Sequence, residues 1–177
     1  MTSFKDRIIR AAKLDVHLYE EVEIDTKAMG QAMMVVALSS IAAGVGTFEK
    51  GGLGGILIGI TAALIGWCIW AYLTYFIGTK FLPESHTKAD FGELLRTIGF
   101  SSSPGLIRVL GIIPGLARIV FLVASIWMLV AMIIAVRQAL DYKSTLRAVG
   151  VCTIGWIIQA LILVLLFSIL GGISKPI

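Results

Sequence analysis

The chain has 177 residues and a net charge of +4; 58% of its residues are hydrophobic and only 15% are charged. A soluble domain carries about 25% charged residues, whereas this chain has a mean hydropathy of +0.93. The composition leaves no room for a soluble catalytic domain and predicts an all-α integral membrane protein. The positive charges flank apolar stretches, as positive-inside topology requires, so they do not indicate nucleic-acid binding.

Residues 1–27 form a charged segment ahead of the first apolar stretch. Phe4, Ile8 and Ala11 recur at helical spacing. The basic residues cluster in the first half: Lys5, Arg7, Arg10 and Lys13. We predict an amphipathic segment in the membrane interface, with these bases beside anionic lipid headgroups. Alternatively, the bases only mark the cytoplasmic side. Residues 28–177 would then be the membrane domain.

Two spans are predicted at 28–48 and 53–78, joined by a tight turn. Glycines recur every four residues around the start of the second span, at Gly51, Gly55 and Gly59. Small residues at this spacing allow two helix backbones to approach closely in a membrane. The pattern predicts a helix-packing face, and we assign the same role to Gly111 and Gly115.

Aromatic residues gather toward the other end of the second span, at Trp67, Trp70, Tyr72 and Tyr75. Tryptophan and tyrosine are enriched at membrane–water interfaces, so an aromatic belt explains this placement. A ligand site lined by aromatic rings is the alternative.

The segment from Ile98 to Ala117 is apolar but interrupted. It contains Pro104 and Pro114 with four glycines, and Arg108 lies near its middle. A helix broken in this way needs neighbouring helices or water to satisfy the freed carbonyls. We predict a broken third span, preceded by a short surface helix beginning near Thr87.

Two more spans are predicted at 118–136 and 148–172, which gives five transmembrane helices. With the N-terminus in the cytoplasm, most basic residues fall on the cytoplasmic side. A re-entrant third segment would place the basic loop 137–147 outside, against the positive-inside rule. We therefore predict a multi-pass protein of the cytoplasmic (inner) membrane, with its C-terminus outside.

Arg108 is the one charge predicted deep within a span, which makes it a candidate functional residue. In one interpretation it binds a lipid phosphate or an anionic substrate beside the broken helix. In the other it bonds to carbonyls freed by Pro114, or to Gln159 in the last span. Pro104 completes this candidate polar, lipid or ligand site.

Two charge pairs lie at the predicted cytoplasmic surface. Glu93 and Arg96 are three residues apart, and Arg137 and Asp141 are four apart, so each pair shares a helical face. Partner docking is one interpretation. Simple pairing or interfacial anchoring is the other, because an exposed pair contributes only about half a kcal/mol.

The sequence shows no catalytic or metal-binding pattern. His17 and His86 lie in polar segments without ligand spacing, and Cys68 and Cys152 fall inside spans. The serines at 101–103 have no His or Lys in any span to act as a base. We predict a protein that is not an enzyme and uses no cofactor or metal. The spans also lack Asp and Glu deep inside, which argues against cation-coupled transport.

Several local runs resemble a known family. They are LYEEVE at 18–23, Gly66-Trp67 followed by Trp70-Ala71, GELLR at 92–96 followed by Gly99-Phe100 and Pro104-Gly105, and AVRQALD at 135–141. Together they resemble the prokaryotic branch of the Yip1 family over nearly the whole chain. The resemblance implies a five-helix membrane domain with a cytoplasmic N-terminus, and it supplies no catalytic residues. Eukaryotic relatives bind prenylated small GTPases through a longer N-terminal region, so the short segment here argues against GTPase binding.

These observations predict a non-enzymatic membrane scaffold or adaptor. It would associate with the lipid bilayer and with other membrane proteins or itself, as an accessory subunit or a homo-oligomer. The alternative is ion or lipid transport that uses the broken third helix and Arg108.

Overall fold

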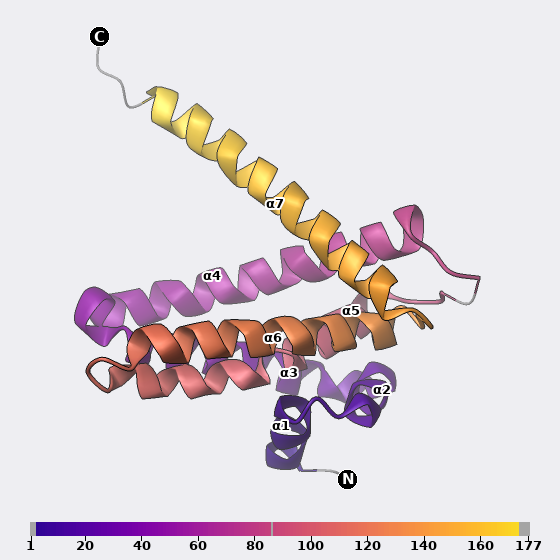
Figure 1. The fold of residues 1–177 in the computed structure, drawn as a ribbon, viewed down its shortest axis with the longest axis horizontal. Coiled ribbons are helices and arrows are strands. Elements are labelled where there is room, and N and C mark those ends of the chain that lie inside the picture. Colours follow the sequence, from indigo (N-terminus) through magenta and orange to yellow (C-terminus); the bar gives the residue numbers. More distant parts are fainter. Residues whose placement is uncertain (1–2, 86, 174–177) are drawn as a thin grey trace.

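The computed structural model describes residues 3–85 and 87–173, and all regular secondary structure in this part of the chain is helical (Figure 1). In chain order the elements are α1 (Phe4–Ala12), α2 (Val16–Ile24), the 3-10 turn η1 (Thr26–Ala28), α3 (Met29–Gly46), α4 (Phe48–Phe76), the π-helical η2 (Ile77–Phe81), α5 (Phe91–Phe100), the 3-10 helix η3 (Ser103–Ile112), α6 (Ala117–Ala139) and α7 (Thr145–Ile173). The predicted all-α class is confirmed over the described residues.

Four helical stretches of the described chain are long and apolar enough to cross a membrane. They are Thr26–Gly46, Gly51–Phe81, Ala117–Ala139 and Thr145–Ile162. Each overlaps one of the continuous spans predicted from the sequence. The chain is therefore a multi-pass membrane protein.

The predicted broken span consists of two helical segments, α5 and η3, joined by a turn. α5 ends at Phe100, a turn follows, and η3 begins at Ser103 with Pro104 in its first turn, where a missing N–H is tolerated. The surface helix expected from Thr87 begins instead at Phe91. Asp90 fixes that start, because its carboxylate accepts from the Glu93 amide at 2.9 Å while the Glu93 carboxylate accepts from the Asp90 amide at 2.7 Å.

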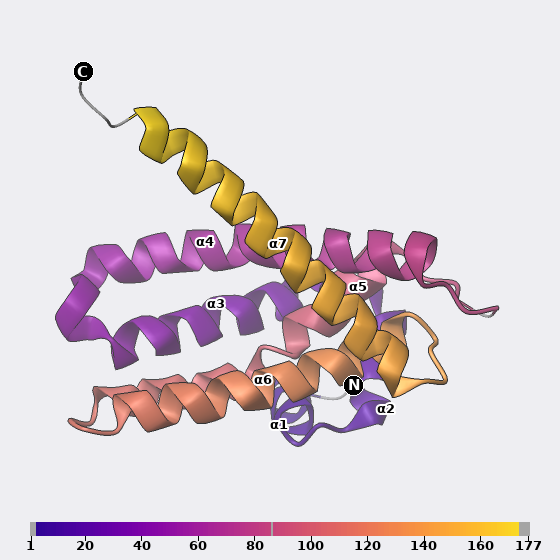
Figure 2. The same cartoon turned by 45° about the horizontal axis from the view of Figure 1, so that its top comes forward.

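The 3-10 helix η3 packs closely against both α3 and α6 (Figure 2). Glycine makes this approach possible, because a Cβ added at Gly46 would overlap the Arg108 carbonyl oxygen. A Cβ at Gly111 would lie 3.1 Å from the Gly46 carbonyl oxygen. The backbones of α3 and η3 thus meet where neither carries a side chain.

The helix bundle has a charged end and a far end. The charged end comprises α2, η2, the start of α5 and the loop residues 82–85, 87–90 and 140–144. There, Tyr142 donates to the carbonyls of Gly78 and Leu82 at 3.0 and 2.7 Å. At the far end lie the turns at 47 and 113–116.

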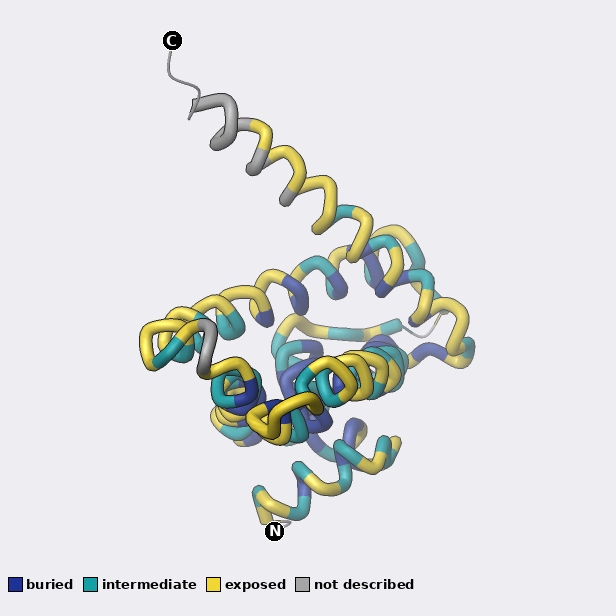
Figure 3. The backbone as a smooth tube through the Cα atoms, turned by 60° about the vertical axis from the view of Figure 1, so that its left-hand side comes forward, coloured by how far each residue is buried: buried dark blue, intermediate teal, exposed yellow. Residues whose placement is uncertain are grey.

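Burial is uneven across the fold. Dark, buried positions gather where α2, α3, α5 and the second half of α6 meet, whereas the first half of α4 and much of α7 are mainly exposed (Figure 3). α7 crosses over α4 and α6 and then diverges from both (Figure 1). The outer faces of α4 and α7 are therefore available to lipid or to another helix.

Candidate functional site

A cleft lies among the helices where α3, α4, α6 and α7 surround the broken segment. Its volume is about 360 Å³. Apart from three tryptophans, its polar lining comes from three elements (α3, η3 and α7) and the turn after α5: Ser39, Ser40, Ser101, Ser102, Arg108 and Gln159. It is a mainly apolar pocket that also carries several polar side chains.

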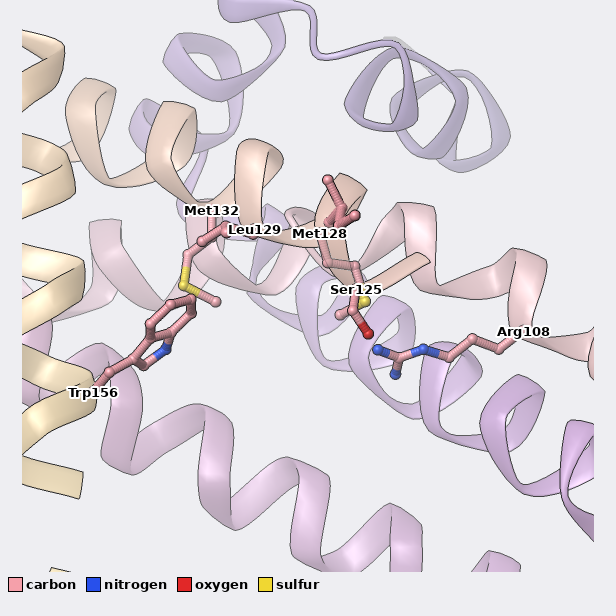
Figure 4. Close-up of a pocket in the computed structure, with 7 residues that line it drawn as sticks. Arg108, Ser125, Met128, Leu129, Met132 and Trp156 are labelled. Carbon is pink, nitrogen blue, oxygen red and sulfur yellow. The ribbon is translucent and has the colours of Figure 1, made fainter. Parts of the chain in front are cut away.

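Arg108 projects from η3 toward Ser125 of α6 (Figure 4). Its guanidinium carbon lies 5.6 Å from the centre of the Phe121 ring, a cation–π contact. The Nε atom is buried and has no hydrogen-bond partner among the described residues. In that part of the chain, neither Gln159 nor a carbonyl near Pro114 accepts a hydrogen bond from Arg108. The hydrogen bonds that the second interpretation gave to this arginine are therefore not formed among the described residues.

The other residues of the predicted polar site separate into two places. Gln159 lines the same cleft as Arg108, and Pro104 is buried at the start of η3. Ser101 and Ser103 donate to the carbonyls of Ile98 and Phe100 at 2.7 Å, which satisfies backbone near the break. Pro114 lies in the turn at the far end instead.

The predicted packing glycines also differ from one another. Gly111 packs against Gly46, and Gly59 lies near Ser40, whose Oγ would be 3.4 Å from an added Cβ. Gly51 and Gly55 have open space within 4 Å of an added Cβ. Gly115 belongs to a turn, where its φ of +83° is a conformation that favours glycine.

The tryptophans of the predicted aromatic belt face the protein. Trp67 and Trp70 are each 8% exposed, and Trp67 Nε1 donates to the Leu95 carbonyl at 3.0 Å. Tyr72 is 55% exposed, as a belt residue would be. Helical periodicity does not distinguish these faces in an apolar helix, so the sequence did not reveal the inward tryptophans.

Arg7 and Arg10 form ion pairs within the protein and are not simply exposed to lipid headgroups. Arg7 is buried and forms ion pairs with Glu21 and Asp25 at 2.9 and 2.8 Å. Arg10 forms ion pairs with Asp15 and Glu21 at 2.7 and 2.6 Å. These bonds fasten α1 to α2 and to the residue that follows it.

Only part of the predicted basic cluster is therefore directed to the surroundings. Lys5 and Lys13 are exposed. Arg7 also donates from Nη1 to Gln31 at 2.9 Å, which ties α1 to the start of α3. The lysines, rather than the arginines, remain available to lipid headgroups.

The two predicted surface pairs are not formed among the described residues. Arg96 is buried and donates from Nε to the Val22 carbonyl at 2.9 Å and from Nη2 to the Glu23 carbonyl. These carbonyls lie in the last turn of α2, where they lack an intrahelical partner. Glu93 is engaged in its helix cap.

Arg137 likewise does not pair with Asp141. Its Nε donates to the Tyr142 carbonyl at 3.2 Å, because the chain turns back over the end of α6. Asp141 takes a positive φ of 53° in that turn. Both arginines thus stabilise connections at the charged end.

The charged end perturbs several carboxyl groups. Burial raises the pKa of Glu23 to about 7, with the nearby Asp141, Glu93 and Glu20 adding to the shift and Arg96 opposing it. The hydrogen bond from Arg7 lowers the pKa of Asp25. Within the described residues no group of three or more His, Cys, Asp or Glu is placed to hold a metal ion.

The Yip1 domain model matches residues 24–169. The chain belongs to the Yip1 family. The matched region begins at the last residue of α2 and extends into α7, so this Yip1 domain contains the Arg108 cleft and leaves α1 outside. No curated protein and no solved structure is significantly similar to the chain. The family resemblance predicted from local runs is confirmed, and its prokaryotic branch remains a prediction.

The sequence did not reveal which side chains join Arg108 in this Yip1 domain. Phe121 and Ser125 lie four residues apart on α6, and both face Arg108. Ser39 and Ser40 come from α3, far away in the chain. The lone charge was a usable signal for Arg108, but its neighbours depend on how the helices assemble.

Proposed function

We propose that this Yip1 family protein is a non-enzymatic scaffold or adaptor that assembles with other transmembrane helices. The single observation that carries the proposal is a face of α4 made of small residues. Its members are Gly55, Ala62 and Gly66, all exposed and all on the helical side of the kink at Gly52. An added Cβ on either of these two glycines has nothing within 4 Å. Close backbone approach is the main source of helix association in lipid, and this chain leaves that face unused.

Large apolar residues surround the small-residue face. Leu57 and Ile58 of α4 are 67% and 73% exposed. Lipid can cover such side chains as well as protein does, so their exposure alone does not indicate a partner. The glycines do indicate a partner, because they allow another helix backbone to approach more closely than a side chain would permit. The partner is therefore a transmembrane helix, from a second copy or another subunit.

Five crossings fit the scaffold best. α5 and η3 have ten residues each, and rises of about 1.5 and 2.0 Å per residue give a combined length of about 35 Å. A hydrocarbon core is about 30 Å thick. The tight packing of η3 against α3 and α6 supports a crossing, since both neighbours are themselves span candidates.

The orientation follows from the basic residues at the two ends. The charged end has Lys80 in η2 and Lys88 and Lys143 in its loops, whereas the far end has Arg118 next to its turn. The positive-inside rule then places the charged end and the N-terminus in the cytoplasm of a prokaryotic cell. Five crossings leave the C-terminus outside.

The start of α1 is proposed to lie in the membrane interface beside the bundle. The end of α1 lies deeper, because Trp127 Nε1, near the middle of α6, donates to the Ala12 carbonyl at 2.8 Å. Ile9 is 42% exposed, and Lys5 and Lys13 are exposed nearby. An apolar side chain flanked by lysines is typical of a helix partly immersed among headgroups.

Native mass spectrometry on protein extracted gently from its own membrane tests the scaffold directly. We expect a complex larger than one chain, and we expect Gly55→Leu to disrupt it. This leucine finds open space within its own chain, so folding should be unaffected. Gly54→Leu is the matched control, since Gly54 is also exposed and open but points about 100° away around the helix. A monomer in gentle extracts, or equal effects of both variants, would contradict the proposal.

A further inference from the structure

Two buried side-chain N–H donors lack an acceptor in the described part of the chain, and both line the same cleft. They are Arg108 Nε and Trp70 Nε1. The Ser39 and Ser40 hydroxyls also line the cleft, and no described residue accepts a hydrogen bond from either. Arginine and tryptophan side chains can only donate. The cleft has acceptor oxygens on Gln159 and its serines, but among the described residues none of them accepts from these two buried donors, which leaves both donors open to a ligand.

The missing acceptor near Arg108 should be negatively charged. A guanidinium stays ionised in proteins, and an unpaired charge in an apolar setting is costly. Among the described residues no carboxylate pairs with Arg108; its partner is the face of Phe121. An oxyanion would neutralise this charge and accept from two guanidinium nitrogens at once, as phosphate and carboxylate groups do.

An apolar groove continues from Arg108 along α6. Ile126, Leu129 and Met132 line it, and Trp156 of α7 closes the end opposite Arg108 (Figure 4). Its volume is about 320 Å³, at the lower end of the range for small-molecule sites. One cationic end and a long apolar wall are complementary to an amphiphile.

We propose that the Arg108 cleft binds an amphiphile whose oxyanion headgroup, a phosphate or a carboxylate, is carried on an acyl chain. The oxyanion contacts Arg108, and the chain follows α6 toward Trp156. The placement suits a lipid of the nearer leaflet. The Arg108 backbone packs on Gly46 at the end of α3, and Ser125 is eight residues into α6 from Ala117, about 12 Å along the helix. The headgroup thus lies toward the far end and the chain points inward.

The test uses the full chain in a non-ionic detergent, titrated with brominated amphiphiles while tryptophan fluorescence is recorded. The probes are a brominated phosphatidic acid, a brominated fatty acid and, as the neutral control, a brominated monoacylglycerol. We expect saturable quenching by an anionic probe with a Kd at least about tenfold below that of the neutral one. The two anionic probes distinguish a phosphate from a carboxylate ligand. Trp156→Phe should reduce the quenching amplitude.

Variants of Arg108 and Arg118 distinguish loss of the binding site from a general loss of positive charge. Arg108→Gln should raise the Kd about tenfold or more, and Arg108→Lys should restore part of the affinity. Arg118→Gln is the matched control, because this exposed arginine lies outside the cleft. If Arg108→Gln does not fold, as judged by circular dichroism, the comparison of anionic and neutral probes on the natural chain still decides.

Three results would overturn the proposal: no saturable quenching by either anionic probe, equal Kd values for anionic and neutral probes, or an unchanged Kd in folded Arg108→Gln. Displacement of the probe by millimolar inorganic phosphate would assign the site to a free anion and overturn the acyl-chain part. Gly66 of the α4 face also lines the cleft, but Gly55 does not. Gly55→Leu and Arg108→Gln therefore test the two proposals separately, and failure of either one leaves the other standing.

Discussion

The charged end of the bundle and its α4–α7 side differ in whether their side chains find partners within the chain. At the charged end, buried polar groups find partners within the chain: Arg96 binds the end of α2, and Tyr142 binds the backbone after α4. On the α4–α7 side, Gly51 and Gly55 face open space, and Leu161 of α7 is 64% exposed. The polar groups of the charged end thus have partners within the chain, whereas the α4–α7 side has a packing face that no described residue covers.

This difference shows where function should be sought. In lipid, exposed apolar side chains are ordinary, so hydropathy does not reveal a binding surface. Two departures from that background are informative here: open glycines on α4 and the unpaired charge of Arg108. Substitutions at the charged end should change folding, whereas substitutions at the α4 face and the cleft should change assembly and ligand binding.

The largest effect on folding is expected for Arg96→Ala. The variant removes the donors to the Val22 and Glu23 carbonyls beneath α2, and we expect a loss of about 3 kcal/mol in the free energy of unfolding. Hydrogen exchange should rise selectively in α2. Unfolding in mixed micelles measures the energy, with Arg118→Ala as the exposed control; equal losses in both variants would contradict a localised role.

Arg7→Gln should have a smaller effect. It removes the ion pairs to Glu21 and Asp25 while a neutral hydrogen-bonding group remains, and we expect a loss of about 2 kcal/mol. Limited proteolysis of α1 and α2 measures the loosening. Lys5→Gln, at an exposed base of the same helix, should leave the cleavage rate unchanged. Similar rates for both variants would show that the Arg7 ion pairs do not hold α1.

Tyr142→Phe isolates a single hydroxyl group. The variant keeps the ring but loses the bonds to the Gly78 and Leu82 carbonyls, so we expect a loss of about 1 kcal/mol. Denaturant unfolding followed by circular dichroism measures this change. Tyr72→Phe, at an exposed ring, is the control. No loss in Tyr142→Phe would mean that water satisfies these carbonyls equally well.

A separate effect is a pH dependence centred on Glu23. Its pKa is raised to about 7 in the folded chain, so the folded state binds a proton that the unfolded state has lost. Stability should therefore fall as pH rises from about 4.5 to about 7. The lowered pKa of Asp25 acts oppositely and reduces stability when pH drops below about 4. Unfolding curves across pH measure both limbs, and Glu23→Gln should flatten only the upper one.

The sequence predicted the all-helical class, the continuous spans and the break near Pro104, because apolar length and proline punctuation act locally. It predicted pairs such as Glu93 with Arg96 wrongly. Arg96 turns to α2, more than seventy residues away, and this choice depends on tertiary packing. For Trp67 and Trp70 the sequence left a belt and a ring-lined site open, and both side chains line the cleft. An apolar helix carries no polar stripe to mark its inner side. Arg108 was found as a lone charge, but its cleft required the assembled helices.

The most direct test of the unused α4 face is cysteine cross-linking in native membranes. Cys68, which is exposed on α4, is first replaced by serine; Gly55→Cys and Gly54→Cys are then compared with a short thiol cross-linker. The account predicts a cross-linked product, a dimer or an adduct with another membrane protein, for Gly55→Cys and little for Gly54→Cys. No product at Gly55→Cys, or equal yields at both positions, would contradict a helix partner on this face.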